Sequence, residues 1–246
     1  MQGVRRVYRR CMGAADLSSF TVKVKESDLW IAVDRESYRD GLAEQVEQLL
    51  WRCRHLLDCY IKEDPGFAAA LSPYLVSFKA PPLVLEMVRA ANRVGVGPMA
   101  SVAGAVAAFI GDALLSRCRE TIVENGGDIF LYTTRERRIA VYAGDSPFSG
   151  KIALRLQPRK KPFAVCTSSG TVGASLSYGI CDACVVISDW VALADACATA
   201  TCNLVKSEED LEEALAFARN IEGIDGVLLV CGERIVAWGN IEIVPV

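Results

Sequence analysis

The chain has 246 residues, of which 52% are hydrophobic and 23% charged, and its formal net charge is −3. This composition allows a large buried core and excludes a disordered chain. A weakly acidic chain of this kind is not expected to bind nucleic acid. The basic segment Arg5–Arg10 precedes no apolar signal segment, and the apolar run Pro98–Ile110 is too short to span a bilayer. We therefore expect a cytoplasmic protein without a membrane partner, folded as a single domain over residues 1–246.

The first ninety residues predict a hairpin and two helices. Residues 21–25 and 29–33 read as two strands. Ser37–Tyr60 is predicted to be a long amphipathic helix, because its apolar side chains recur at helical spacing, and Pro65–Gly66 ends it. A further helix is predicted over Pro81–Asn92, with proline at its start.

A helix with small side chains is predicted next, from Pro98 to about Cys118. Its residues Ala100, Ala103 and Gly104 belong to a side that is almost bare of side chains. Such a side admits either close packing against a sheet or the approach of a planar ligand.

The rest of the chain combines strands and helices. Strands are predicted at residues 121–123, 129–133, 139–143, 151–156, 163–166, 183–187, 227–230 and 234–238. Helices are predicted at Trp190–Val205 and Glu208–Arg219, the second with Ser207 as its N-cap. Runs of strands with hairpin turns, punctuated by helices, indicate an α+β fold with antiparallel sheets backed by helices.

Two loops carry the polar chemistry of the chain. The first is Asn125-Gly126-Gly127-Asp128, whose glycines let the backbone approach a ligand without obstruction from a Cβ atom. The second is Thr167-Ser168-Ser169-Gly170, whose hydroxyls and amides are suited to cradle an anion. The single histidine, His55, lies inside a predicted helix, so a Ser-His-Asp or Cys-His mechanism is not expected.

The predicted helix Trp190–Val205 carries a carboxylate and a hydroxyl one turn apart. Asp195 and Thr199 are four residues apart and therefore share one helix face. Both can direct oxygen toward a hard cation such as Mg²⁺.

These three segments, in this order, resemble the ApbE family, the FAD:protein FMN transferases. The resemblance covers roughly residues 95–203 and implies an ApbE-like, T-fold-like two-repeat architecture. It further implies a metal site, Mg²⁺ at Asp195 and Thr199, and a site for FAD or FMN, or another phosphate-bearing nucleotide. The residues implied to bind this cofactor are Asn125, Gly126, Gly127, Asp128, Thr167, Ser168, Ser169 and Gly170. In ApbE enzymes Mg²⁺ positions the pyrophosphate of FAD so that FMN passes to a threonine or serine of a protein partner.

The chain departs from that family in the segment Gly95–Ala105, which lacks the lysine of the family's Gly-x-x-Lys-Gly-Tyr-type segment. The whole set of motifs looks more like a little-characterised ApbE-like family of bacteria and methanogenic archaea, which in archaea has been linked to sulfur assimilation and homocysteine formation. Three hypotheses therefore stay open. They are a Mg²⁺-dependent flavin-transfer enzyme, a sulfur-assimilation protein, and a non-catalytic binding or partner protein on the same fold.

Ten cysteines are present, and in a reducing compartment they are expected to remain thiols. Cys181 and Cys184 have the spacing of a metal or thiol-exchange pair but run into a predicted strand, and we expect no zinc there. Cys166 precedes the Thr167–Gly170 loop and is the candidate catalytic residue. Loop amides would lower the pKa of its thiol and let it carry sulfur. The alternative is a small side chain packed inward at the end of a strand.

Overall fold

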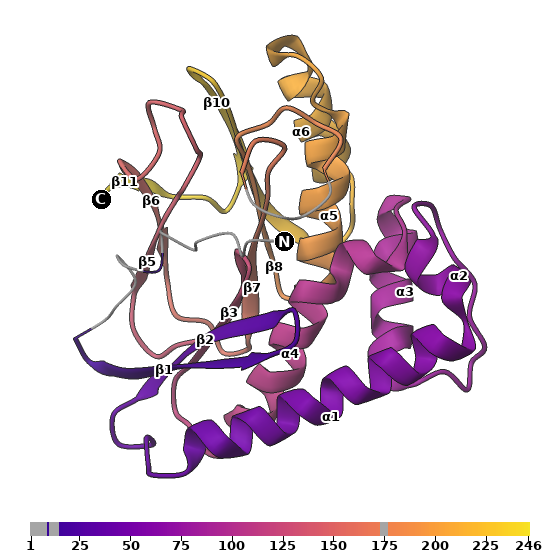
Figure 1. Cartoon of the computed structure of the whole chain (residues 1–246). Coiled ribbons are helices and arrows are strands. Elements are labelled where there is room, and N and C mark those ends of the chain that lie inside the picture. Colours follow the sequence, from indigo (N-terminus) through magenta and orange to yellow (C-terminus); the bar gives the residue numbers. More distant parts are fainter. Residues whose placement is uncertain (1–8, 10–14, 173–176) are drawn as a thin grey trace.

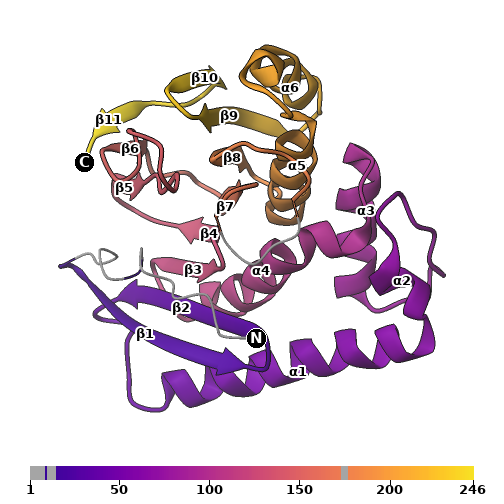
Figure 2. The ribbon, with the colours of Figure 1, turned by 45° about the horizontal axis from the view of Figure 1, so that its top comes forward.

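The computed structural model describes Arg9, residues 15–172 and residues 177–246. In this part of the chain an eight-stranded antiparallel sheet lies between a layer of helices and a small three-stranded sheet (Figure 1 and Figure 2). The α+β class and the antiparallel pairing expected from the sequence are confirmed.

The large sheet has the strand order β1-β2-β3-β4-β7-β8-β9-β10, and each neighbouring pair is antiparallel. Its strands are β1 (Leu17–Val24), β2 (Ser27–Asp34), β3 (Thr121–Asn125), β4 (Asp128–Tyr132), β7 (Phe163–Ser168), β8 (Ala183–Ser188), β9 (Ile224–Cys231) and β10 (Arg234–Gly239). The small sheet has the order β11-β6-β5, with β5 (Arg137–Ala140), β6 (Ile152–Leu156) and β11 (Ile243–Pro245).

The helices cover one face of the large sheet (Figure 2). They are α1 (Leu42–Glu63), α2 (Pro65–Ala69), α3 (Pro82–Val94), η2 (Pro98–Ser101), α4 (Val102–Leu115), α5 (Val191–Leu204), η3 (Glu208–Asp210) and α6 (Leu211–Arg219). Of these, α5 packs against β7 and β8, and α4 packs against β3 and β4.

The alternation of side chains along the strands divides the core in two. On β7, Ala164 and Cys166 belong to the core beneath the helices, whereas Phe163 and Val165 belong to the core beneath the small sheet. This separation follows from the two-residue period of a strand. Polar residues of β7 that lie an even number of positions from Cys166 therefore face the helices.

The small side chains of α4 serve close packing. A Cβ atom added to Gly111 would lie only 2.3 Å from the ring of Phe130 on β4. The helical segment Pro98–Leu115, which is longer than the apolar run Pro98–Ile110, is long and apolar enough to cross a membrane by length and composition alone. Half of this segment is buried within the protein, which is typical of a helix that packs on the core.

Several boundaries differ from the sequence prediction for local reasons. Helix α1 begins at Leu42 and not at Ser37, because Gly41 is left-handed (φ 84°) and the Asp34 carboxylate holds the Ser37 amide and hydroxyl in a turn. The helix expected from Pro98 begins as a 3₁₀ turn, in which the Ser101 hydroxyl donates to the Pro98 carbonyl. The short elements α2 and β11 were not predicted.

We expect Gly111→Ala to destabilise the fold. Alanine gains about 1 kcal/mol of helix propensity over glycine, but overpacking in a filled core costs about 1–3 kcal/mol, and here the new methyl meets an aromatic ring. Urea denaturation should show a net loss of stability. In a Phe130→Leu background the same change should cost less, because the two sites are coupled. A more stable Gly111→Ala protein would contradict the packing described.

Candidate functional site

Polar side chains gather on the helix face of the large sheet, where β3 and β7 end and β4 begins. Asn125 and Asp128 are opposite each other at the tip of the β3–β4 hairpin. The Asn125 amide donates to the carbonyl oxygen of Ala103, 3.0 Å away, at the start of α4. The hairpin tip is thus tied to the first turn of α4.

The hairpin turn requires its two glycines. Gly126 and Gly127 have φ values of 73° and 108°, as in a two-residue turn of the type that matches strand twist. A Cβ atom on Gly127 would lie 3.4 Å from the carbonyl oxygen of Thr167, so the turn passes close to the end of β7. The Gly127 amide donates to Glu124, 2.9 Å away. The Gly-Gly-Asp loop and the start of the Thr167–Gly170 loop are therefore neighbours.

Asp195 lies on α5 and binds the start of α4. Its Oδ2 accepts a hydrogen bond from the Gly104 amide at 2.7 Å. Only a glycine fits opposite it, since a Cβ atom at Gly104 would lie 2.8 Å from the Asp195 Cβ. Burial raises the pKa of Asp195 to about 7, although the amides of Gly104 and Ala103 act in the opposite direction. One carboxylate oxygen is thus committed to the helix terminus.

Asp128 is the second buried carboxylate of this cluster. Its pKa is raised well above the ordinary value by burial and by the charge of Asp195. The Cys166 thiol and the Thr167 amide favour the ionised form, but less strongly. Its Oδ1 atom is buried and has no hydrogen-bond partner among the residues that the structure describes. A buried carboxylate oxygen without a partner is costly, so the pair requires a proton or a cation.

The donor set suits a hard cation and not a soft one. In the described part of the chain, no three His, Cys, Asp or Glu side chains form a metal site. Asp128 and Asp195 would therefore need further oxygen ligands from hydroxyls, carbonyls, water or a phosphate, which is how Mg²⁺ is commonly bound. Thr199 is one turn after Asp195 on the same helix and is half-buried. The carboxylate oxygens of Asp128 and Asp195 are of the type that Mg²⁺ binds.

Cys166 does not have the environment expected from the sequence. Its side chain is fully buried, with Sγ 3.7 Å from the carbonyl oxygen of Val191. Burial and the charges of Asp128 and Asp195 raise the pKa of its thiol well above the ordinary value. The expectation of a lowered pKa at Cys166 is therefore wrong. The thiol remains protonated and hydrogen-bonds to Asp128.

The residues of the Thr167–Gly170 loop have two different structural roles. The Ser169 hydroxyl accepts from the amides of Thr171 (3.1 Å) and Val172 (2.9 Å), and so shapes the loop. The Gly170 amide donates to the Cys181 carbonyl at 2.8 Å. Ser168 is buried on the helix face and hydrogen-bonds to the Cys202 thiol of α5. Ser168 thus faces the helix, whereas Ser169 and Gly170 hold the loop.

Sequence analysis missed two participants in this cluster. Gly104 supplies the amide that Asp195 accepts, and Cys202 meets Ser168. A signal for Cys202 existed, because Asp195, Thr199 and Cys202 follow the i, i+4, i+7 spacing of one helix face. Gly104 gave no such signal, because a glycine on a helix face of small side chains is equally consistent with close packing against a neighbouring element.

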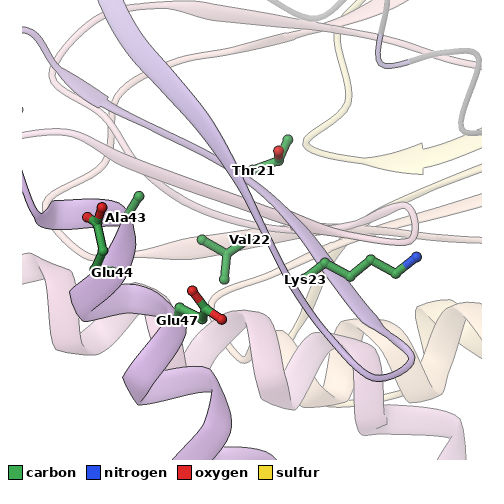
Figure 3. Close-up of a pocket in the computed structure, with 6 residues that line it drawn as sticks. All are labelled: Thr21, Val22, Lys23, Ala43, Glu44 and Glu47. Atoms are coloured by element: carbon green, nitrogen blue, oxygen red, sulfur yellow. The ribbon is translucent and has the colours of Figure 1, made fainter.

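Two surface hollows lie outside this cluster. One is lined by Thr21, Val22, Lys23, Ala43, Glu44 and Glu47, between the edge strand β1 and the first turns of α1 (Figure 3). The other, of about 350 Å³, is lined by Tyr142, Gly144, Asp145, Thr171, Val172 and Asp182. Thr171 donates to Asp182 there at 2.7 Å. Neither hollow includes Asp128 or Asp195.

Solved structures with a similar fold include flavin transferases. The flavin transferase ApbE from Vibrio cholerae superposes with a TM-score of 0.57 at 14% identity, covering 92% of this chain and 97% of that one. The Pseudomonas stutzeri flavinyl transferase ApbE, in its apo form, gives a TM-score of 0.53 at 17% identity, covering 90% and 93%. At such low identity the likeness establishes the fold alone, and it confirms the ApbE-like architecture.

Sequence relatives establish the family. The UPF0280 protein of Methanosarcina acetivorans is 38% identical over 221 residues, covering 89% of this chain and 85% of the relative. The UPF0280 protein of Methanococcoides burtonii is 39% identical, with coverages of 89% and 91%. A family model described as AbpE bacteria matches residues 9–242. The chain therefore belongs to this ApbE-like family, together with the UPF0280 proteins of methanogenic archaea.

Proposed function

We propose that this protein binds a flavin nucleotide together with a divalent cation, as part of a flavin-transfer reaction onto a protein partner. The observation that carries the proposal is the buried pair Asp128 and Asp195, one of whose oxygens has no partner in the described chain. The pair lies beside a glycine turn and a hydroxyl-rich loop. The likeness to flavin transferases supplies the class of ligand.

Each element has a defined task in this proposal. Asp195, Thr199 and Asp128 would hold Mg²⁺, with Asp195 kept in place by the Gly104 amide. The exposed Gly126 and the neighbouring Gly127 would let a phosphate-bearing ligand approach the backbone. The half-buried Thr167 and the loop after it would meet the ligand from the other side. When bound, Mg²⁺ would neutralise the pyrophosphate charge and orient the ligand.

A binding protein without transfer activity is the second candidate. The observation that favours it is the absence of a lysine from the segment Gly95–Ala105, where ApbE enzymes carry one. The sulfur-assimilation hypothesis loses its proposed nucleophile, since the Cys166 thiol is buried and its pKa is raised. We place the protein in the cytoplasm and propose a partner protein with an accessible threonine or serine as the flavin acceptor.

Calorimetric titration with FAD, FMN and ADP, with and without Mg²⁺, tests the binding. We expect a phosphate-bearing flavin to bind more tightly with Mg²⁺. Asp195→Asn and Asp128→Asn should each weaken this binding by roughly tenfold or more, equivalent to at least about 1.4 kcal/mol, because each removes a carboxylate ligand. Asp145→Asn, in the separate hollow, is the matched control and should bind normally. The proposal fails if folded protein takes up none of the three ligands, or if both cluster variants bind like the control.

The stability of the ligand-free protein should depend on pH through Asp195. Its pKa is 3.8 when unperturbed and about 7 when folded, so between these values the folded state holds more protons than the unfolded state. The free energy of unfolding therefore falls as the pH rises from about 4 to about 7, and the loss is complete above that range. Thermal melts at about pH 5 and pH 8 should show a drop of several degrees, given about 2–4 °C per kcal/mol for a chain of this size.

The variant Asp195→Asn keeps an acceptor for the Gly104 amide but cannot ionise. It should therefore lose less stability across this pH range than the unmodified protein. Added Mg²⁺ should raise the melting temperature more at the higher pH, where the carboxylates are ionised. Parallel pH profiles for the variant and the unmodified protein would contradict the assignment.

A further inference from the structure

An arginine that is far from the polar cluster in the sequence lies beside the glycine turn of that cluster. The Arg9 guanidinium contacts one residue of β2, Asp28, and one residue of β3, Glu124. Its Nε donates to Glu124 Oε2 and its Nη1 to Asp28 Oδ1, each at 2.6 Å, and its Nη2 donates to the Asp28 carbonyl, also at 2.6 Å. The Arg9 side chain is 13% exposed and that of Glu124 is 1% exposed. Arg9 is thus held in a buried network and is not a solvated charge.

Glu124 connects this arginine to the Gly126–Gly127 turn. One carboxylate oxygen of Glu124 accepts from Arg9, and the other, Oε1, accepts the Gly127 amide at 2.9 Å. Hydrogen bonds to an ionised group are shorter and stronger than those between neutral groups. A change in the position of the Glu124 carboxylate would therefore act directly on the turn.

The turn is held from both faces of the sheet. Neighbouring residues of a strand point to opposite faces, so Glu124 and Asn125 act on opposite sides of β3. Asn125 ties the hairpin to Ala103 on the helix face, and Glu124 with Arg9 ties it on the other face. The turn has no side chains that fix its own conformation, because both of its residues are glycines with positive φ. These two anchors therefore supplement the hydrogen bonds between β3 and β4 in fixing the turn.

We propose that Arg9 is a positioning residue for the nucleotide site, which holds the Gly126–Gly127 turn, through Glu124, in the conformation that a phosphate-bearing ligand meets. This inference rests on the proposed function, because it assigns Arg9 a role at that same site. Gly127 passes close to the Thr167 carbonyl, so a shifted turn would also change its spacing from the Thr167–Gly170 loop.

Arg9 acts through Glu124 and does not itself contact the ligand. Without the bonds from Arg9, the glycine turn has more conformations to lose when a ligand binds. We therefore expect Arg9→Gln to weaken the binding of FAD in the presence of Mg²⁺ by roughly three- to tenfold.

A second arginine provides a matched control. Arg137 on β5 is 10% exposed, and it joins Asp16 to Glu120, a buried glutamate that immediately precedes β3. Its network resembles that of Arg9 but lies at the opposite end of β3 from the glycine turn. Arg137→Gln should therefore also destabilise the fold but leave nucleotide affinity unchanged.

Hydrogen exchange of the ligand-free protein and calorimetric titration with FAD and Mg²⁺ test the inference together. In Arg9→Gln the Gly127 amide should exchange faster with solvent deuterium and FAD should bind more weakly, whereas Arg137→Gln should show neither change. Arg9→Lys keeps the charge but not the forked donors, so its affinity should lie between those of the unmodified protein and Arg9→Gln. In a Glu124→Gln background the substitution Arg9→Gln should cost less affinity, because both changes act through one contact.

Folded Arg9→Gln protein with unchanged exchange at Gly127, or with unchanged FAD affinity, would overturn the inference. Equal losses of affinity in Arg9→Gln and Arg137→Gln would overturn it as well, because they would indicate a general effect of lower stability. If Arg9→Gln does not fold, the same two measurements on Arg9→Lys decide. If the unmodified protein binds no nucleotide, the proposed function fails, whereas exchange at Gly127 still decides whether Arg9 holds the turn.

Discussion

The arrangement of this protein around its polar cluster depends on keeping two carboxylates buried side by side. Asp128 and Asp195 come from different layers, one from the start of strand β4 and the other from helix α5, which packs against the sheet. Desolvation disfavours both charges, and the charge of Asp195 makes Asp128 still harder to ionise. A fold that retains such a pair must supply compensating groups or reserve the position for a cation.

The surrounding structure supplies part of that compensation. The first turn of α4 directs its Gly104 amide at Asp195, where the unpaired amides of a helix start favour negative charge. The same turn accepts the Asn125 amide, which fixes the hairpin that carries Asp128. Glycine at position 104 allows the two helices to approach closely enough for this contact. The Asp128 oxygen that stays unsatisfied in the described structure is what remains for a ligand.

Much of this arrangement could be predicted from the sequence. Two of the three segments that resemble ApbE proteins meet at one end of the sheet, because the register of β3 with β4 and the passage of Gly127 past Thr167 bring them together. From the third segment, the charge of Asp195 reaches Asp128. Their residue types alone indicated oxygen ligands and a close backbone approach. Strand and helix types were likewise predictable wherever the apolar pattern was long.

The chemistry of individual cysteines could not be predicted in this way. A thiol's pKa depends on the groups that surround it in three dimensions. Cys166 and Cys202 both come near the same loop only when the chain folds, so the sequence does not reveal their surroundings. The alternation of side chains along β7 points Cys166 into the core beside two carboxylates, and burial and the charges of these carboxylates raise the pKa of its thiol. The pKa of Cys202 is instead lowered, mainly by a hydrogen bond with Cys181 and less strongly by those with Ser177 and Ser168. Boundaries such as the start of α1 were also decided by local side-chain contacts.

A crystal of the full-length protein grown with Mn²⁺ and FAD is the most direct test of the central claim. Manganese replaces Mg²⁺ at oxygen ligands and can be located by its anomalous scattering. The account predicts an anomalous peak in contact with the carboxylates of both Asp128 and Asp195, with the flavin phosphates beside the Gly126–Gly127 turn. A metal and flavin bound elsewhere on the molecule, with Asp128 satisfied by protein or water alone, would contradict it.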